Sequence, residues 1–485
     1  MYNIAGINYR LILRFLSVAL FILAGITMIT GIVGVLYNEK DYVYFFVYTV
    51  FLIIAAILLI VFIPLKGQKS INIRDSFLII LFLWIILPVL GMLPFLIISP
   101  INNITDALFE SFAGFTTTGF STLTEYENVS KSIIFWRAII QWLGGMGILI
   151  LIIAIIPFFG RGNVKIFFSD LQDVEFSPLH QRIGKTAKSL WYIYIIYSVF
   201  GIIALYIAGQ DIFDSVIYSF AAISTGGGVP VNGNLTHLSF EVKTVIMVLM
   251  LVAGANYFFL FKSVRKFKII KSEEINVYFL ILIISFVLIA VAGILNIGYS
   301  NTLLFESLFN TVSFVSTTGF YSAEVFTTKI LFIWVVLFFL LFIGSSTGSS
   351  GGGINVYRII VLAKMVINYI KELLHPNLLN TIKLDKKPVS FKIIHSIIGF
   401  FVLYMLIFIV GAFILTIFGY NMENAFSLCA ASLSNTGPGV FLLDEYFCIS
   451  DINIGAKYTV MFLMIIGRVE LFPILIVFSK VFWKR

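Results

Sequence analysis

Thr116-Thr117-Thr118-Gly119-Phe120 is a short polar stretch that follows an apolar run. The chain contains three related stretches, and a glycine of each aligns with the glycine of the first. They read Ser224-Thr225-Gly226-Gly227-Gly228, Ser316-Thr317-Thr318-Gly319-Phe320 and Ser434-Asn435-Thr436-Gly437-Pro438. The copies are separated by roughly 90 to 120 residues, so we interpret them as parts of one supersecondary unit repeated with loops of variable length.

A short apolar segment of small residues precedes each Thr/Gly stretch. Each segment is shorter than the ~20 residues that cross a bilayer, so it predicts a short re-entrant helix. Irregular backbone at membrane depth is tolerated only inside protein or beside a watery cavity. Four such loops around one axis would form a ring of backbone carbonyls, which is how potassium-selective pores replace the hydration shell of the ion. We interpret four acids at the starts of these segments as groups that offset the helix dipoles: Asp106, Asp214, Glu306 and Glu423.

The composition is that of a polytopic membrane protein. Of the 485 residues, 60% are hydrophobic and 12% are charged, and the mean hydropathy is +1.05. The formal charge is +8, but the basic residues lie mostly between apolar runs, which indicates membrane orientation rather than nucleic-acid binding. Two cysteines, Cys429 and Cys448, are too few for a disulfide framework or a metal site of their own.

Long apolar runs predict ten membrane spans. Two leading runs, at about 11–36 and 43–65, have no Thr/Gly stretch after them, and the first is too long for a cleavable signal peptide. The other runs flank the four stretches in pairs: 76–99 and 132–158, 189–208 and 243–261, 275–298 and 328–343, and 393–418 and 457–479. The predicted fold is therefore an all-α polytopic membrane protein, with four span–pore-helix–span repeats around a pseudo-fourfold pore and two N-terminal spans.

The basic residues predict the orientation of these spans. Most of the 32 Lys and Arg residues fall on the side opposite the Thr/Gly loops. By the positive-inside rule this side is cytoplasmic, so the Thr/Gly loops approach from outside and both termini lie in the cytoplasm.

Residues 344–353 read Gly-Ser-Ser-Thr-Gly-Ser-Ser-Gly-Gly-Gly and interrupt an apolar helical pattern. A continuous helix through them would be roughly twice as long as the hydrocarbon core is thick. Because only about 15 apolar residues precede the run, we interpret it as an intramembrane loop. The alternative is a flexible linker at the cytoplasmic surface.

Two arginines interrupt apolar runs. Arg468 lies inside the last predicted span, where a charge is costly and marks a functional residue by default. Pairing with Glu470 is disfavoured because residues two apart on a helix do not face each other. A positive charge beside a cation pore would act as a barrier to passage. We interpret Arg137 as a residue near the outer end of its span whose head group reaches the interface.

These features together resemble the Trk/Ktr/HKT superfamily of cation transporters, and most closely its TrkH branch. The resemblance covers essentially the whole chain. It is carried by the four Thr/Gly loops and by further motifs, which are Gln141-Trp-Leu-Gly-Gly-Met-Gly147, Gly353-Ile-Asn-Val-Tyr-Arg358, Ser434-Asn-Thr-Gly-Pro-Gly439 and Gly467-Arg-Val-Glu470. The two leading spans favour the TrkH branch over shorter KtrB-like proteins.

The resemblance implies potassium uptake across the bacterial plasma (inner) membrane. It implies that K⁺ is held at a selectivity filter of Thr117, Thr118, Gly119, Thr225, Gly226, Gly227, Thr317, Thr318, Gly319, Asn435, Thr436 and Gly437. It implies a gate formed by Gly344, Ser345, Ser346, Thr347, Gly348, Ser349, Ser350, Gly351, Gly352 and Gly353 together with Arg468. It also implies a homodimer in membrane lipid, and a cytoplasmic TrkA-like subunit that binds the regulatory nucleotide, since this chain has no nucleotide motif and no organic cofactor site.

The resemblance also divides the chain. We expect two leading helices at 1–68, then pore repeats at 69–180, 181–272, 273–388 and 389–485, the third of which contains the loop 344–353. Seven basic residues after that loop, from Arg358 to Lys392, would offer a docking surface to the regulatory subunit.

Three other functions are possible on these residues. A sodium-conducting relative is disfavoured because all four aligned filter positions are glycine, whereas some plant members of the superfamily have serine at the first. A coupled carrier with alternating access usually has ionisable residues at mid-membrane and two matched halves, whereas this chain has four units and few buried acids. The chain contains no His-Glu-x-x-His or Gly-x-Ser-x-Gly motif, so a membrane enzyme is the least favoured alternative.

Overall fold

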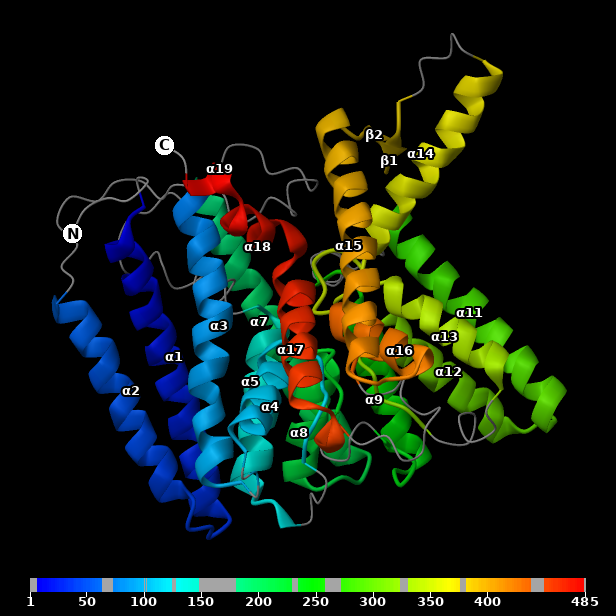
Figure 1. Ribbon diagram of the computed structural model, residues 1–485. Helices are drawn as coiled ribbons and strands as arrows, with labels where there is room; N and C mark the ends of the chain where they lie inside the picture. Colours follow the sequence, from blue (N-terminus) through cyan, green and yellow to red (C-terminus); the bar gives the residue numbers. More distant parts are fainter. Residues whose placement is uncertain are drawn as a thin grey trace.

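The computed structural model describes residues 7–62, 73–99, 101, 103–123, 128–147, 180–228, 234–257, 272–322, 330–375, 381–437 and 449–483. These residues are mostly helical, and the long apolar helices stand side by side (Figure 1). This confirms the all-α fold class. In the described part of the chain the only strands are the short hairpin β1 (Lys383–Leu384) and β2 (Lys387–Pro388).

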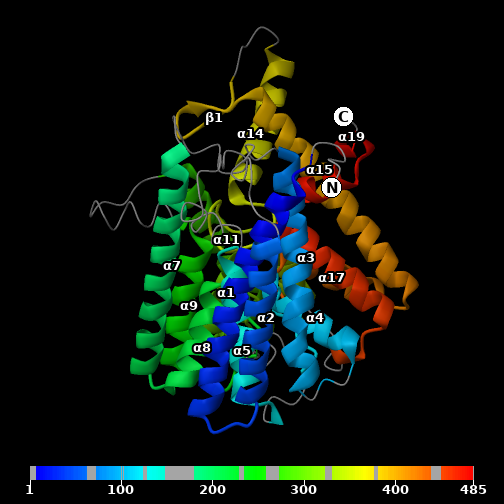
Figure 2. The same ribbon diagram turned by 90° about the vertical axis from the view of Figure 1, so that its left-hand side faces the viewer.

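The two leading helices are α1 (Tyr9–Leu36) and α2 (Tyr42–Phe62). They pack against each other along their length, and α1 also contacts α3 and α5, as Figure 2 shows. Glu39, in the short turn between them, accepts hydrogen bonds from the backbone N–H groups of Lys131 (2.5 Å) and Ser132 (2.9 Å). The leading pair is therefore fastened to the start of α5.

Each of the four units consists of a long helix, a short helix that ends in a Thr/Gly loop, and a return helix. The long helices are α3 (Ile73–Ile97), α7 (His180–Ile207), α11 (Glu273–Ile297) and α15 (Phe391–Ile417). The short helices are α4 (Ile104–Phe115), α8 (Ile212–Ile223), α12 (Asn301–Val315) and α16 (Met422–Ser434). The return helices are α5 (Lys131–Gly145), α9 (Phe240–Gly254), α13 (Leu331–Phe342) and α17 (Ile454–Val469).

Within the described residues, six helices are long and apolar enough to cross a membrane, or seven if α17 and α18 (Leu471–Phe478) form one span. The other return helices are shorter. Parts of the predicted spans 132–158 and 243–261, namely residues 148–158 and 258–261, lie outside the described residues. Helix α13 ends where the Gly/Ser run begins, and α14 (Val356–Leu374) continues beyond it.

Two details differ from the sequence-based expectations. The last span is not straight, because α17 and α18 meet at an angle of 110° at Glu470, whose φ is 64°. The third short helix begins at Asn301, so Glu306 lies in its second turn instead of at its start. The interpretation of Glu306 as a dipole-capping residue is therefore wrong, and its carboxylate instead accepts a hydrogen bond from Ser322 Oγ at 2.9 Å.

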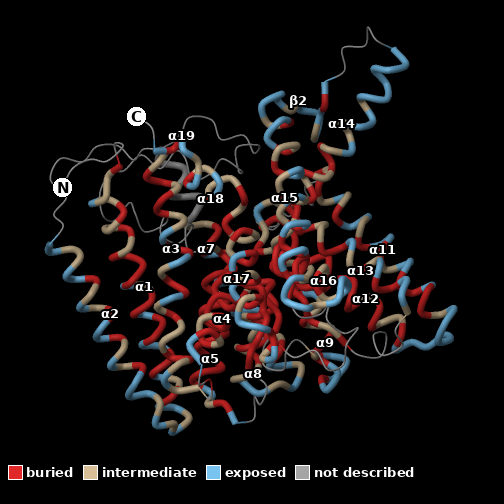
Figure 3. The backbone as a smooth tube through the Cα atoms, in the orientation of Figure 1, coloured by how far each residue is buried: buried red, intermediate tan, exposed pale blue. Residues whose placement is uncertain are grey.

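Buried residues concentrate in the middle of the molecule, where the short helices end (Figure 3). The four Thr/Gly loops all lie in this region and are buried. The membrane-facing sides of the outer helices, such as α2 and α15, remain apolar and exposed. The loops are thus enclosed by protein, which is the condition for irregular backbone at membrane depth.

Candidate functional site

The same backbone turn closes all four short helices. In each, the residue before the aligned glycine donates its N–H to a carbonyl five residues earlier. The bonds run from Thr118 to Ala113 (3.0 Å), Gly226 to Ala221 (3.0 Å), Thr318 to Ser313 (2.9 Å) and Thr436 to Ala431 (3.0 Å). A 6→1 bond of this kind is the Schellman ending of a helix. The sequence repeat is therefore also a repeat of backbone geometry.

The residue at the centre of each turn has a left-handed backbone. The φ angles are 56° at Thr117, 51° at Thr225, 57° at Thr317 and 54° at Asn435. This conformation is unfavourable for a β-branched residue and costs on the order of 1–3 kcal/mol. Three threonines in this state at equivalent positions show strain that the surrounding structure maintains, which is typical of a functional site.

The four aligned glycines form a closed ring with the backbone of the neighbouring loops. A Cβ atom placed on Gly119 would lie 1.9 Å from the carbonyl oxygen of Gly226, and one on Gly227 would lie 2.1 Å from that of Thr318. A Cβ on Gly319 would lie 1.8 Å from the oxygen of Thr436. One on Gly437 would lie 2.2 Å from the oxygen of Thr118, which returns to the first loop. Only glycine fits at these four positions.

The geometry of this ring suits a cation. The C-terminal ends of α4, α8, α12 and α16 lead directly into it, and a helix carries roughly −0.5 charge at its C-terminus. Backbone carbonyls add further partial negative charge around the same axis. The ring therefore provides oxygen ligands and a negative potential without a carboxylate. In the described part of the chain, no cluster of His, Cys, Asp and Glu could hold a metal ion.

The Gly/Ser loop, residues 344–353, packs against the residues at which the short helices α8 and α12 end, next to the ring. Gly352 donates its N–H to Thr317 Oγ1 (2.9 Å), and Ser345 Oγ donates to the carbonyl of Ser316 (3.1 Å). Ser350 Oγ donates to the carbonyl of Ile223 at the end of α8 (2.9 Å). The run is therefore packed inside the protein, against the end of α8 and the third Thr/Gly loop, which favours an intramembrane loop over a linker at the surface.

Arg468, near the end of α17, connects the Gly/Ser loop to the first unit. Its Nη1 donates to the carbonyl of Ser350 (2.8 Å), and its Nη2 donates to the carbonyls of Gly144 (2.6 Å) and Gly145 (2.7 Å). The described residues give it no carboxylate partner. Glu470 pairs instead with Arg358, 3.0 Å away, as the sequence argument against an Arg468–Glu470 pair requires. The uncompensated guanidinium leaves a positive charge beside the loop.

The chain matches the family model described as TrkH, a cation transport protein, over residues 43–484. The chain belongs to the TrkH family. It is 32% identical to the Trk system potassium uptake protein TrkH of Escherichia coli, over 99% of this chain and 100% of that protein. It is 26% identical to the TrkG protein of the same organism, over 93% and 94% of the two chains. The crystal structure of the potassium transporter TrkH from Vibrio parahaemolyticus has a TM-score of 0.87 and 30% identity, and covers 99% of this chain and 100% of its own.

Membership of the TrkH family makes this chain an integral membrane transporter and not an enzyme. The predicted family is thereby confirmed, together with the fold that it implies.

Arg137 lies in the interior and not at the interface, so the interpretation of this residue from the sequence is wrong. The side chain does not reach the interface, because it is fully buried and forms an ion pair with the equally buried Glu110. It also donates to three backbone carbonyls next to the ring, those of Gly119 (3.1 Å), Phe120 (3.0 Å) and Gly228 (3.1 Å). The sequence did contain a signal for this pair, because an arginine in an apolar run is usually functional and is paired with another polar group.

Further charged groups lie near the end of the molecule where the short helices begin, which is the lower end in Figure 1. Lys457 on α17 is buried and pairs with Asp106 of α4 at 2.6 Å. Lys243 on α9 is also buried and donates to Ser322 Oγ (3.2 Å). His237, in the connection between α8 and α9, is partly buried beside Lys243, and desolvation together with that charge lowers its pKa. Lys457 and Lys243 thereby hold neighbouring units together at this end of the molecule.

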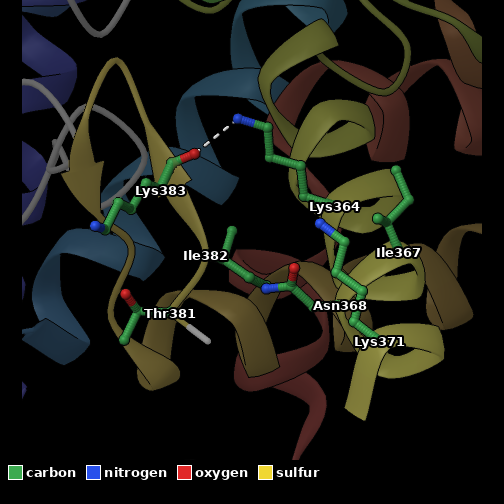
Figure 4. Close-up of a pocket in the computed structure, with 7 residues that line it drawn as sticks. All are labelled: Lys364, Ile367, Asn368, Lys371, Thr381, Ile382 and Lys383. Atoms are coloured by element: carbon green, nitrogen blue, oxygen red, sulfur yellow. Dashed lines mark hydrogen bonds between the residues drawn. The ribbon is translucent and has the colours of Figure 1, made fainter. Parts of the chain in front are cut away.

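A glutamate that the sequence analysis missed supports the Gly/Ser loop from the other side. Glu274, in the first turn of α11, is 4% exposed, and its Oε1 accepts the N–H of Thr347 at 2.6 Å. Glu273 beside it pairs with Lys364 of α14 (2.5 Å). Lys364 lines a pocket of about 310 Å³ with Lys371 and Lys383, and it donates to the carbonyl of Lys383 (2.7 Å), as Figure 4 shows.

Proposed function

We propose that this chain takes up potassium across the plasma membrane through the ring of Thr/Gly loops. The closed order of the ring is the observation that carries the proposal. Each aligned glycine packs against the carbonyl of the next loop, and the fourth loop returns to the first. Such a ring supplies oxygen ligands on all sides of one axis, which is what a dehydrated potassium ion requires.

The proposed filter consists of the three central residues of each loop. The left-handed residues at 117, 225, 317 and 435 turn the chain, and the glycines at 119, 227, 319 and 437 allow neighbouring loops to approach. A serine at one of the glycine positions would force the ring apart, since the Cβ clash is with rigid backbone. Glycine at all four aligned positions, where some plant members of the superfamily have serine at the first, supports potassium rather than sodium as the transported ion.

The proposed gate is the Gly/Ser loop with Arg468. The loop lies against the ends of α8 and α12. Arg468 adds a positive charge that donates hydrogen bonds to backbone carbonyls, and within the described residues no carboxylate neutralises this charge. A buried cation on the ion path raises the energy of a second cation there. Moving the loop away with the guanidinium would lower that barrier.

We propose that a cytoplasmic TrkA-like subunit regulates the transporter. We also propose that the transporter works as a homodimer in the membrane. Basic residues of α14 and the hairpin β1–β2, the elements that follow the Gly/Ser loop, line one pocket and would offer the TrkA-like subunit a positively charged surface; they include Lys364, Lys371 and Lys383. By the positive-inside rule this end of the molecule, with both termini, faces the cytoplasm. We further propose that the leading pair and the four pore repeats keep the boundaries given above.

Potassium flux into proteoliposomes tests the proposed function. Purified protein is reconstituted with an outward potassium gradient, and uptake of radioactive rubidium or potassium is measured with sodium or potassium as the external competitor. Potassium should compete much more strongly than sodium. Equal competition by sodium would indicate a sodium-conducting protein of the same fold, and no flux with either ion would contradict the proposal.

A further inference from the structure

The second Thr/Gly loop departs from the other three at one position. The first, third and fourth Thr/Gly loops (loops 1, 3 and 4) have a threonine before the aligned glycine. The Oγ1 of this threonine forms a hydrogen bond with the hydroxyl of the residue two positions earlier. The three distances are 2.8 Å (Thr116–Thr118), 2.8 Å (Ser316–Thr318) and 2.7 Å (Ser434–Thr436). Loop 2 has Gly226 instead and lacks this bond.

Gln141, from α5 of the first unit, occupies the space that a threonine side chain would fill. A Cβ atom on Gly226 would lie 1.8 Å from Gln141 Nε2. The same Nε2 donates to the carbonyl oxygen of Gly227 at 2.9 Å. Gln141 is fully buried, so water does not compete for the hydrogen bond of its Nε2. A residue of unit 1 thereby completes the loop of unit 2.

Arg137 lies one helical turn before Gln141 on the same face of α5 and acts on loop 1 in a similar way. Its guanidinium donates to the carbonyl of Gly119, at the glycine level of the ring, and to that of Gly228 just beyond Gly227. Glu110 holds the guanidinium in place. The Glu110 carboxylate also accepts from Thr122 N (2.8 Å), so it fixes the chain that leaves the ring.

In the described part of the chain, the third and fourth loops have no equivalent donors. The residues equivalent to Glu110 are Tyr218, Asn310 and Leu428. Among the described residues, no side chain donates to the carbonyl of Gly319 or Gly437, whereas those of Gly119 and Gly227 each accept one hydrogen bond from α5. Within the described residues, the carbonyls of Gly119 and Gly227 are therefore each held by a side chain of α5, and those of Gly319 and Gly437 accept no side-chain hydrogen bond.

We propose that Gln141 and the Glu110–Arg137 pair are specificity-determining residues of the ring, an inference that rests on the proposed filter. They hold two of the four glycine carbonyls at a fixed distance from the axis. A smaller cation such as sodium is bound well only if the carbonyls move inward, and held carbonyls resist that movement. The buried network is suited to this role because charge-assisted hydrogen bonds in a dry interior are strong and rigid.

The test compares variants that remove these donors with a matched control. Gln141→Leu removes one donor and keeps the volume. The double variant Glu110→Gln, Arg137→Gln removes a buried ion pair without leaving an unpaired charge. The control is Asp106→Asn with Lys457→Gln, which also removes a largely buried ion pair but touches no ring carbonyl. Arg137→Lys keeps the charge but loses the planar fork that reaches several carbonyls.

The measured quantity is the potassium-to-sodium permeability ratio in proteoliposomes, at equal amounts of monodisperse protein. We expect the ratio to fall about tenfold in the Glu110/Arg137 double variant, equivalent to the loss of about 1.4 kcal/mol of discrimination. Gln141→Leu and Arg137→Lys should lower it in the same direction. The Asp106/Lys457 control should keep the wild-type ratio even if its melting temperature falls.

Wild-type ratios in folded Gln141→Leu and Arg137→Lys would overturn the inference, and these two decide the matter if the double variant does not fold. An equal fall in the Asp106/Lys457 control would also overturn it, because the effect would then be one of general stability. Failure of the proposed filter is distinguishable. In that case the wild type itself would show no preference for potassium, or Gly319→Ala would leave its ratio unchanged.

Discussion

Nη1 of Arg468 lies 2.8 Å from the carbonyl oxygen of Ser350 and donates a hydrogen bond to it. The same guanidinium bonds the last carbonyls of α5, so one side chain links unit 1, unit 4 and the Gly/Ser loop of unit 3. Ser350 in turn donates to the end of α8 in unit 2. All four units therefore meet at this contact. A movement of the Gly/Ser loop here would be transmitted to all four units of the ring.

Arg468→Ala should raise potassium flux or weaken its regulation. The substitution removes a charge from the proposed ion path and frees the carbonyl of Ser350, so the loop loses one of its attachments. Flux should rise severalfold in proteoliposomes. Arg468→Lys is the control, because it retains the charge with fewer donors and should give an intermediate result. If the alanine variant folds and matches the wild type in flux, ion competition and regulation, the arginine has only a structural role.

Gly319→Ala should reduce selectivity for potassium. The added Cβ would meet the carbonyl oxygen of Thr436 at 1.8 Å, and rigid backbone has to move. Gly209→Ala is a matched control, since Gly209 also has a positive φ (98°) but has open space where the Cβ would be. Backbone strain is thus present in both variants, and the ring clash in only one. Equal potassium-to-sodium ratios in the two variants would argue against a filter at Gly319.

Glu274→Gln should destabilise the observed position of the Gly/Ser loop. A hydrogen bond to a buried carboxylate contributes about 1.5–3 kcal/mol, and the neutral amide is a weaker acceptor for the N–H of Thr347. Basal flux should therefore increase. Glu273→Gln is the control, because its carboxylate is partly exposed and its pair with Lys364 contributes at most about 1 kcal/mol. Similar flux in the two variants would show that Glu274 does not hold the gate.

Deleting residues Ser345 to Ser350 should give high flux that no longer responds to the regulatory partner. The deletion removes the contacts of the loop with Ser316, Ile223 and Arg468. Flux is measured in liposomes with and without the partner and its nucleotide. A gate elsewhere in the molecule would leave both the basal flux and the nucleotide response of the deletion variant at wild-type values.

Glu39→Ala should lower the stability of the protein without changing its selectivity. The carboxylate caps the first N–H groups of α5, and loss of a helix cap costs about 1 kcal/mol. The melting temperature of detergent-solubilised protein should fall. Glu241→Ala, at the exposed first turn of α9, should have a smaller effect. A changed potassium-to-sodium ratio in Glu39→Ala would mean that the leading helices influence the ring.

The sequence predicted those features that depend on neighbours along the chain. The Thr/Gly stretches follow short segments of small residues, and this local pattern predicts a short helix followed by a loop, whereas the left-handed backbone of Thr117 and Thr317 is imposed by the folded surroundings. The Gly/Ser run breaks a helix wherever it occurs, because glycine and serine favour other backbone conformations. The sequence also predicted a ring, because the pattern recurs four times in an apolar chain.

The partners of the buried charges were decided by the tertiary structure alone. Arg137 and Glu110 are 27 residues apart, and Arg468 is 324 residues from Gly144, so no local pattern joins them. Whether an arginine in an apolar run reaches the interface or lies buried depends on which helices surround it, and that is fixed only when the chain packs. The role of Gln141 likewise depends on Gly226, a residue of another unit, because a glycine leaves a space and only the folded neighbour determines what fills it.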